Sequence, residues 1–197
     1  SGWNVSSVTR CTGIYKNAIL DPLYRAPVPI QCLSDIKFAA FSDNNELLNA
    51  LNDYSSSRED YIKTYDKYGP LINWNIIKVK DMTNIYKNRN FNDFKKYGII
   101  TNNIPSNWNV SKVTNMTSMF EKTTFTTNTE NILDSWIIDK VTIMDNLFKD
   151  VIGPIPSLNN WFTIYASSIN YMFTNATTFN QDLSNISFEY WSNPTNC

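Results

Sequence analysis

The side chains that most often carry out chemistry in proteins are scarce in this chain of 197 residues. It has no histidine, so the commonest general base and the commonest transition-metal ligand are both missing. Its five glycines form no cluster of the kind that binds phosphate. The three cysteines, Cys11, Cys32 and Cys197, are too few for a disulfide framework, and their spacing matches no zinc site. The residue types therefore predict no catalytic residue, no cofactor and no metal.

The remaining candidates for catalysis are carboxylates. Asp134 with Asp139, or Asp145 with Asp150, could form the acid pair of a glycoside hydrolase. The oxygen-rich segment 180–182 could bind calcium, although its spacing matches no known calcium loop. Solvated positions on a repeat surface explain the same residues better, so we predict that the protein is not an enzyme. A hydrolase would need two acidic side chains that converge in a concave pocket.

A repeated segment accounts for most of the other residues. Five of the six tryptophans begin similar stretches, and the copy from Trp108 reads Trp-Asn-Val-Ser-Lys-Val-Thr-Asn-Met-Thr-Ser-Met-Phe. The last four copies are 34, 28 and 25 residues apart, and a degenerate copy follows at Ile186. Self-similarity of this kind indicates a repeat architecture. The five copies begin at Trp3, Trp74, Trp108, Trp136 and Trp161.

Apolar residues recur at fixed positions in every copy. The residues two, five, eight, eleven and twelve positions after the tryptophan are apolar, except Thr163, which predicts one buried side per copy. Between Val113 and Phe120 the spacing also suits two turns of a helix, for which Ser111 or Asp139 would be an N-cap. Two turns are too short to be stable alone, so neighbouring copies should stack and share a core. We therefore expect the tryptophans to form a ladder.

Two segments together resemble the bacterial surface-protein repeat of about 26 residues. They are the segment from Trp108 and the segment 172–184, which reads Met-Phe-Thr-Asn-Ala-Thr-Thr-Phe-Asn-Gln-Asp-Leu-Ser. That repeat is abundant in mycoplasma and Listeria surface lipoproteins, occurs in some protists and large DNA viruses, and is akin to BspA-type leucine-rich repeats. The resemblance covers residues 71–190 well and 3–18 less completely. It implies an α/β repeat, a right-handed leucine-rich-repeat-like solenoid of short strands and short helices, used for surface display, adhesion or recognition.

Residues 19–70 interrupt the repeats. Ser42-Asp43 followed by Glu46 resembles a capping signal, Ser57 is typical of a second helix start, and Gly69 followed by proline is typical of a helix end. We predict a single repeat domain over residues 1–197 with an α-helical insertion near its N-terminus. The insertion would either carry a partner-binding surface or cover an exposed end of the core.

Charge and hydropathy limit the possible partners. Seventeen basic and 18 acidic residues give a net charge of −1, so no strong field would attract nucleic acid or an anionic membrane. No apolar run approaches the length of a membrane span. The chain begins Ser-Gly-Trp, in phase with the repeat, so we expect a processed product or a piece of a longer polypeptide. Asn-x-Ser/Thr sequences, which can accept N-glycans, begin at Asn4, Asn109, Asn115, Asn175 and Asn185.

Two functions are consistent with these features. The first is a non-enzymatic repeat protein that provides a rigid surface for binding a protein, such as a surface receptor, or a glycan at a cell or particle exterior. The second is a structural component of a large virus particle, minor capsid or scaffold-like, whose partners would be neighbouring subunits. We expect an extracellular or cell-surface location for the first and a virion for the second. The sequence singles out no ligand-binding residue.

Overall fold

The computed structural model describes residues 38–91, 104–125, 132–162 and 165–183. Its helices are α2 (Asn44–Ser56), α3 (Arg58–Tyr68) and a short 3-10 helix, η1 (Leu71–Asn73). The predicted copies at Trp3 and Ile186 lie outside the described residues, as do the three cysteines and the first part of the predicted insertion, 19–37.

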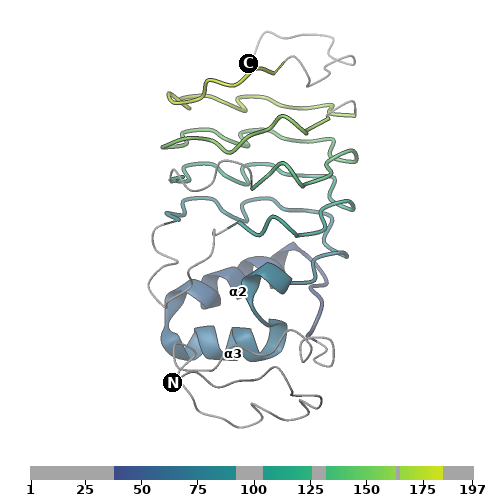
Figure 1. Ribbon diagram of the computed structural model, residues 1–197, viewed down its shortest axis with the longest axis vertical. Coiled ribbons are helices and arrows are strands. Elements are labelled where there is room, and N and C mark those ends of the chain that lie inside the picture. Colours follow the sequence, from purple (N-terminus) through teal and green to yellow (C-terminus); the bar gives the residue numbers. More distant parts are fainter. Residues whose placement is uncertain (1–37, 92–103, 126–131, 163–164, 184–197) are drawn as a thin grey trace, which may run out of the picture.

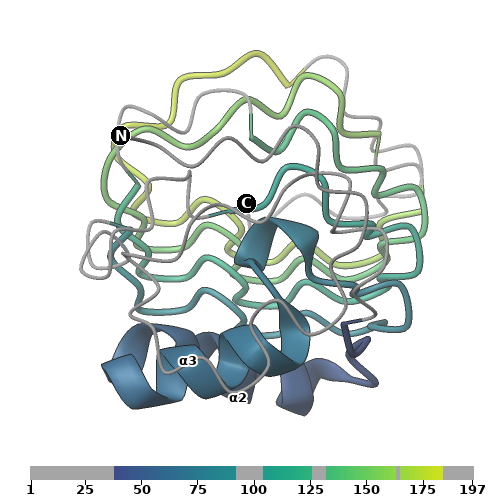
Figure 2. The ribbon, with the colours of Figure 1, turned by 60° about the horizontal axis from the view of Figure 1, so that its bottom comes forward.

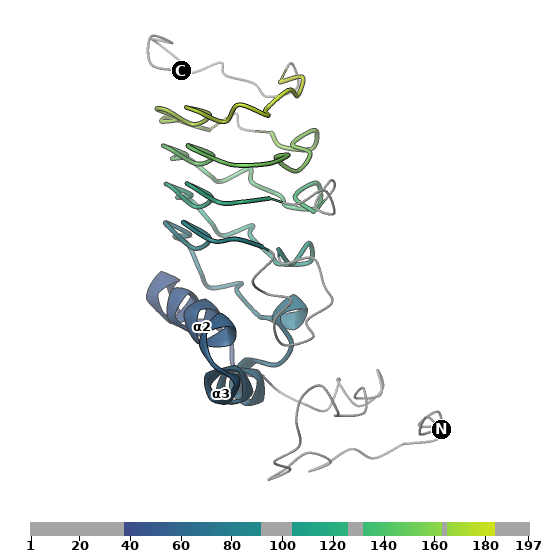
Figure 3. The ribbon, with the colours of Figure 1, turned by 90° about the vertical axis from the view of Figure 1, so that its left-hand side faces the viewer.

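The chain beyond α3 forms coils that are stacked along the long axis of the molecule (Figure 1, Figure 3). The described part contains four tryptophans, one in each coil. The helices α2 and α3 lie at one end of the stack, and the view from that end shows them in front of the coils (Figure 2). We name the coils A (71–91), B (104–125), C (132–153) and D (157–162 and 165–179).

The buried side chains follow the predicted apolar positions. In coils A, B and C, every residue two, five, eight, eleven and twelve positions after the tryptophan is at most 2% exposed. In coil D, Ala166, Ile169 and Met172 are buried and Phe173 is partly buried, while Thr163 lies outside the described residues. The prediction of one buried side per copy is therefore confirmed for coils A to C, and these side chains belong to one continuous core.

The four described tryptophans form the predicted ladder. The ring centroids of Trp74 and Trp108 are 6.2 Å apart, and those of Trp108 and Trp136 are 6.5 Å apart, with interplanar angles of 12° and 7°. From coil B onward, each indole N–H donates to the backbone carbonyl three residues before the tryptophan of the preceding coil, at 3.0–3.1 Å. Because a buried N–H needs a partner, this bond fixes each indole against its neighbouring coil.

The predicted fold class is wrong. The described residues contain no β-strand, and apart from η1 the coils consist of turns, extended segments and isolated parallel bridges. This part of the chain is therefore not an α/β leucine-rich-repeat-like solenoid of short strands and short helices. The bridges join equivalent positions of successive coils, in the columns Asp81–Asn115–Ile143–Ser168 and Asn90–Thr124–Ile152.

The helix predicted from Val113 to Phe120 is absent because alternate amides point in different directions. In coil B, four alternate N–H groups between residues 116 and 122 donate to carbonyls of coil C at 2.8–3.0 Å, and the amides between them close turns within coil B. An α-helix directs every amide to its own preceding turn, so none would be left for the next coil. The predicted N-caps Ser111 and Asp139 accordingly lie in turns.

This alternation depends on left-handed residues at two fixed positions. In all four coils, the residues ten and fourteen positions after the tryptophan have φ between 53° and 64°. Asparagine and aspartate occur in this conformation more often than other residues with a side chain, and five of these eight residues are of those types. The eight residues are Asn84, Asn88, Ser118, Lys122, Asn146, Asp150, Tyr171 and Asn175.

Both predicted helix starts are confirmed. The Asp43 carboxylate accepts a hydrogen bond from the Glu46 N–H (2.9 Å) at the start of α2, and the Ser57 hydroxyl accepts one from the Asp60 N–H (3.1 Å) at the start of α3. Helix α3 ends at Gly69, also as predicted, with a φ of 76° that suits glycine. Local capping therefore decides where these helices begin, and where α3 ends.

The helical pair covers the coil A end of the core. The rings of Phe41 and Tyr54 pack on Trp74 at centroid separations of 4.9 and 5.3 Å. The Asn44 amide donates to two carbonyls of coil A at 3.0–3.1 Å, and the equivalent carbonyls of coil B accept amides from coil A. The Arg89 guanidinium bonds both to coil A and to the C-terminal turn of α2. These contacts are those of a covering element, one of the two roles predicted for the insertion.

Replacing Phe120 by alanine should destabilise the whole stack. Its ring is fully buried and lies between those of Tyr86 and Phe148, at 5.6 and 5.4 Å. We expect the free energy of unfolding, measured with denaturant, to fall by about 3–5 kcal/mol. The exposed Lys140→Ala is the control and should change it by less than about 0.5 kcal/mol. A similarly small effect of Phe120→Ala would show that this ring contributes little to the core.

Replacing Lys122 by glycine should stabilise the protein. Lys122 is exposed and has φ of 56°, a conformation that glycine adopts without steric cost, and its N–H donates to the next coil from the backbone. We expect a gain of about 0.5–1 kcal/mol in the free energy of unfolding. Lys112, which is exposed but has no positive φ, is the matched control, and its change to glycine should destabilise. Equal losses from both variants would contradict the role given to the left-handed positions.

Candidate functional site

Large apolar side chains are exposed mainly in coils C and D. Ile137, Phe162 and Tyr165 are 64%, 59% and 58% exposed, and Ile152 and Tyr171 are also exposed. Coils A and B have no exposed large hydrophobic residue among their described residues except Ile72 in η1. Exposed apolar groups that gather on one part of a surface often mark a contact with another molecule.

Two of these residues occupy the same position in successive coils. Ile137 and Phe162 each directly follow a tryptophan, and Asn75 and Asn109 stand at this position in coils A and B. All four are exposed. One edge of the stack therefore changes from amide side chains in coils A and B to apolar side chains in coils C and D.

A groove of about 330 Å³ lies on this edge, between coils B and C. Residues 106–111 line it together with Ser135 and Ile137. Every lining side chain is uncharged, and most carry an amide or a hydroxyl. The groove can therefore offer hydrogen bonds and apolar contact to a ligand, but it has no acid, base or nucleophile arranged for catalysis.

The Asn-x-Ser/Thr sequences of the coils serve as local turn motifs. The Asn109 Oδ1 atom accepts hydrogen bonds from both the N–H (3.2 Å) and the hydroxyl (2.7 Å) of Ser111. Asn115 makes the same pair of bonds with Thr117, at 2.9 and 2.7 Å. This arrangement accounts for their recurrence without any modification. The Asn175 amide bonds to a carboxylate of coil C (2.7 Å), and Asn4 and Asn185 lie outside the described residues.

One of the two predicted acid pairs, Asp145 with Asp150, bonds coil C to coil D. Asp145 accepts from the Ser168 hydroxyl (2.6 Å) and from a backbone N–H of coil D (2.7 Å), and Asp150 accepts from the Asn175 amide (2.7 Å). Asp134 has one buried carboxylate oxygen with no hydrogen-bond partner among the described residues, and Asp139 is exposed. Neither pair lines the groove between coils B and C.

The segment proposed for calcium has a structural contact. The Gln181 side chain accepts a hydrogen bond from the Leu158 N–H (3.0 Å) and donates to the carbonyls of Ile155 and Pro156 (2.8 and 3.0 Å). Its amide therefore connects the end of coil D to the chain that enters it. Among the described residues, no cluster of three acidic, cysteine or histidine side chains could hold a metal ion.

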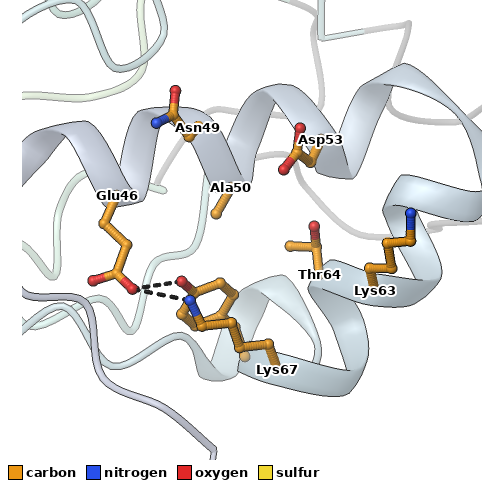
Figure 4. Close-up of a pocket in the computed structure, with 8 residues that line it drawn as sticks. Glu46, Asn49, Ala50, Asp53, Lys63, Thr64 and Lys67 are labelled. Carbon is orange, nitrogen blue, oxygen red and sulfur yellow. Dashed lines mark hydrogen bonds and ion pairs between the residues drawn. The ribbon is translucent and has the colours of Figure 1, made fainter.

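A second cavity, of about 300 Å³, lies between α2 and α3 (Figure 4). Two of its charged groups pair with each other: Glu46 accepts hydrogen bonds from the Lys67 ammonium (3.2 Å) and also from the Tyr68 hydroxyl (2.7 Å). The bond from Tyr68, with further bonds from Ser42 and Lys67, lowers the pKa of Glu46 to about 2. Lys63 forms an ion pair with Glu59 on the same helix (2.8 Å). This cavity is a junction between two helices whose charges are largely satisfied.

One family model matches the chain, and it is described as Mycoplasma protein of unknown function, DUF285. The match covers residues 91–196, which is more than half of the chain and includes coils B, C and D. No curated protein and no solved structure matches the sequence. Within the described residues, no helix has the length and apolar character needed to cross a bilayer.

Replacing Glu46 by glutamine should remove a pH-dependent contribution to stability. The folded state lowers the pKa of this carboxyl group, so its contribution is complete above about pH 4.5 and is lost as the pH falls toward 2. Since the Glu46 side chain is 29% exposed, we expect the free energy of unfolding of the variant to be only about 1 kcal/mol lower at pH 7. The difference in free energy of unfolding between the variant and the parent chain, measured with urea, should be smaller at pH 3.

Glu59→Gln is the control, since its partner Lys63 lies on the same exposed helix face. That exposed pair is worth little, so the control should differ from the parent by less than about 0.5 kcal/mol at either pH. A loss in Glu46→Gln that is the same at pH 7 and pH 3 would contradict the assigned role.

Proposed function

Because the chain belongs to the DUF285 family of Mycoplasma-associated proteins, whose function is unknown, we propose a function from its surface. We propose that it is a non-enzymatic repeat protein whose stacked coils provide a rigid surface for binding a protein or glycan at a cell or particle exterior. The observation that carries the proposal is the edge at which Ile137 and Phe162 are exposed beside an uncharged groove. Exposed apolar groups next to amides and hydroxyls are typical of recognition surfaces.

The rigidity of the stack supports this proposal. Each coil from B onward is bonded to the preceding one through its backbone, its indole and its buried rings. A surface that is already ordered loses little conformational entropy on binding, so its few contacts can give useful affinity. The resemblance of the tryptophan-led segments to the 26-residue bacterial surface repeat points to the same use, as does the Mycoplasma association of the family.

The alternative is a structural component of a large virus particle. The exposed Ile152 favours it, because an aliphatic side chain on a second bridge column would suit burial against a neighbouring subunit. The two proposals differ in oligomeric behaviour. A recognition protein should remain monomeric at micromolar concentration in sedimentation experiments, whereas a particle component should self-associate through the column that contains Ile152.

The proposal is tested by changing the exposed edge. A labelled chain would be applied to an array of extracellular matrix proteins and glycans, and the double variant Ile137→Ser with Phe162→Ser should bind its targets at least about tenfold more weakly. Both residues are exposed, so the melting temperature should stay within about 2 °C of the parent value. Ile152→Ser is the matched control, since Ile152 and Ile137 are both 64% exposed. Absence of any target on the array, or equal losses from control and double variant, would contradict the proposal.

A further inference from the structure

Three lysines occupy one position in three successive coils. Lys78, Lys112 and Lys140 each stand four residues after a tryptophan, and all three are exposed. Each is the third residue of a β-turn that is closed by a backbone hydrogen bond of 2.8–3.0 Å between the flanking apolar residues. The same turn therefore presents the same ammonium group in coils A, B and C.

Backbone bonds hold these turns in register. Two residues beyond the lysine, the Thr114 N–H donates to the Lys80 carbonyl (2.8 Å), and the Thr142 N–H donates to the Thr114 carbonyl (2.9 Å). The parallel bridge column that begins at Asp81 follows directly. Backbone segments bonded in this way lie about 4.8 Å apart, so the backbones of successive lysines are separated by one coil spacing. We call Lys78, Lys112 and Lys140 the lysine column.

No counter-ion of the lysine column is found in the part of the chain that the structure describes. Among the described residues, ion pairs involve Lys63, Lys67 and Lys87, and no carboxylate lies within ion-pairing distance of the lysine column. Like charges on neighbouring coils repel, and none of the described residues relieves this repulsion by an ion pair. In contrast, Lys87 of coil A is paired with Glu121 of coil B at 2.8 Å. An external anion along the lysine column would provide the missing neutralisation.

An aromatic ring continues the column. In coil D the equivalent residue is Tyr165, which is 58% exposed, and the exposed Phe162 lies three residues before it. The flat face of a sugar ring carries C–H groups, which pack well on such rings. The ammonium groups suit a partner with regularly spaced anions. The exposed ring of Tyr165 suits a partner that also has apolar ring faces.

We propose that the lysine column and Tyr165 bind an anionic polysaccharide that runs along the stack, with about one acidic sugar per coil. This inference rests on the proposed function of the stack as an exterior binding surface, and it names the class of ligand. An extended pyranose is about as long as one coil spacing. Duplex DNA carries one phosphate per strand about every 3.4 Å of helix axis, on strands that wind around that axis, which is a poorer match to a straight column.

The test measures binding of the intact chain to size-defined heparin and galacturonate oligosaccharides, which carry an anionic group on each sugar, by fluorescence anisotropy at several salt concentrations. The triple variant Lys78→Gln, Lys112→Gln, Lys140→Gln should bind at least about tenfold more weakly at low salt. The slope of log Kd against log salt concentration should fall by about 2, since about three ion contacts are lost. Tyr165→Ser should weaken binding severalfold and leave that slope unchanged.

The control changes three other lysines, Lys63, Lys122 and Lys149, to glutamine and alters the net charge equally. It should change Kd by less than about twofold if position, and not total charge, decides affinity. Equal losses of oligosaccharide affinity in the two triple variants would overturn the inference. It would also be overturned if single-stranded DNA or phosphatidylserine vesicles bound through the lysine column more tightly than the oligosaccharides. If matrix proteins bind the chain and neither oligosaccharide does, this inference fails while the proposed function stands. If nothing on the array binds, both fail.

Discussion

The structure depends on the use of every second backbone amide to join one coil to the next. In coils A to C, the amides eight, ten, twelve and fourteen positions after the tryptophan donate to the next coil, and those between them close turns. Because each coil has its amides in the same places, successive coils correspond residue by residue over the stretch that follows the tryptophan. The left-handed residues, such as Asn84 and Asn146, make this alternation possible, since they reverse the direction in which consecutive amides point.

Superimposed coils turn every sequence position into a column. Buried columns hold the indoles and the rings that include Phe120 and Phe148, which pack face to face. Exposed columns bring together side chains that are about thirty residues apart, and a single coil could not display such a set. At the coil A end there is no preceding coil in the described residues, and side chains such as Asn44 and Arg89 donate to its free carbonyls. Side chains at the helical pair thus bond to coil A carbonyls equivalent to those that join the other coils.

The exposed columns differ between the two halves of the stack. Position four after the tryptophan is lysine in coils A to C and Tyr165 in coil D, while the first position changes from asparagine to Ile137 and Phe162. A cationic stretch and an apolar stretch therefore lie on neighbouring turns of one edge. This arrangement suits recognition of an extended ligand better than the enclosure of a small one, and the groove between coils B and C is correspondingly open and uncharged.

The sequence by itself determined the repeat, the buried positions, the ladder of tryptophans and the helix starts at Asp43 and Ser57, because these follow from apolar spacing and local capping. It did not determine the conformation of the coils, since the spacing of Val113, Met116 and Phe120 suits a helix as well as a chain of turns. The asparagines at 84 and 88 were the available signal, because this residue favours left-handed turns over helix interiors. Only the tertiary structure decided between a helix and a chain of turns, because the amides that bond to the next coil gain their partners once that coil is in place. The same stacking decided which exposed residues become neighbours, so the exposed edge and the lysine column were beyond reach of the sequence alone.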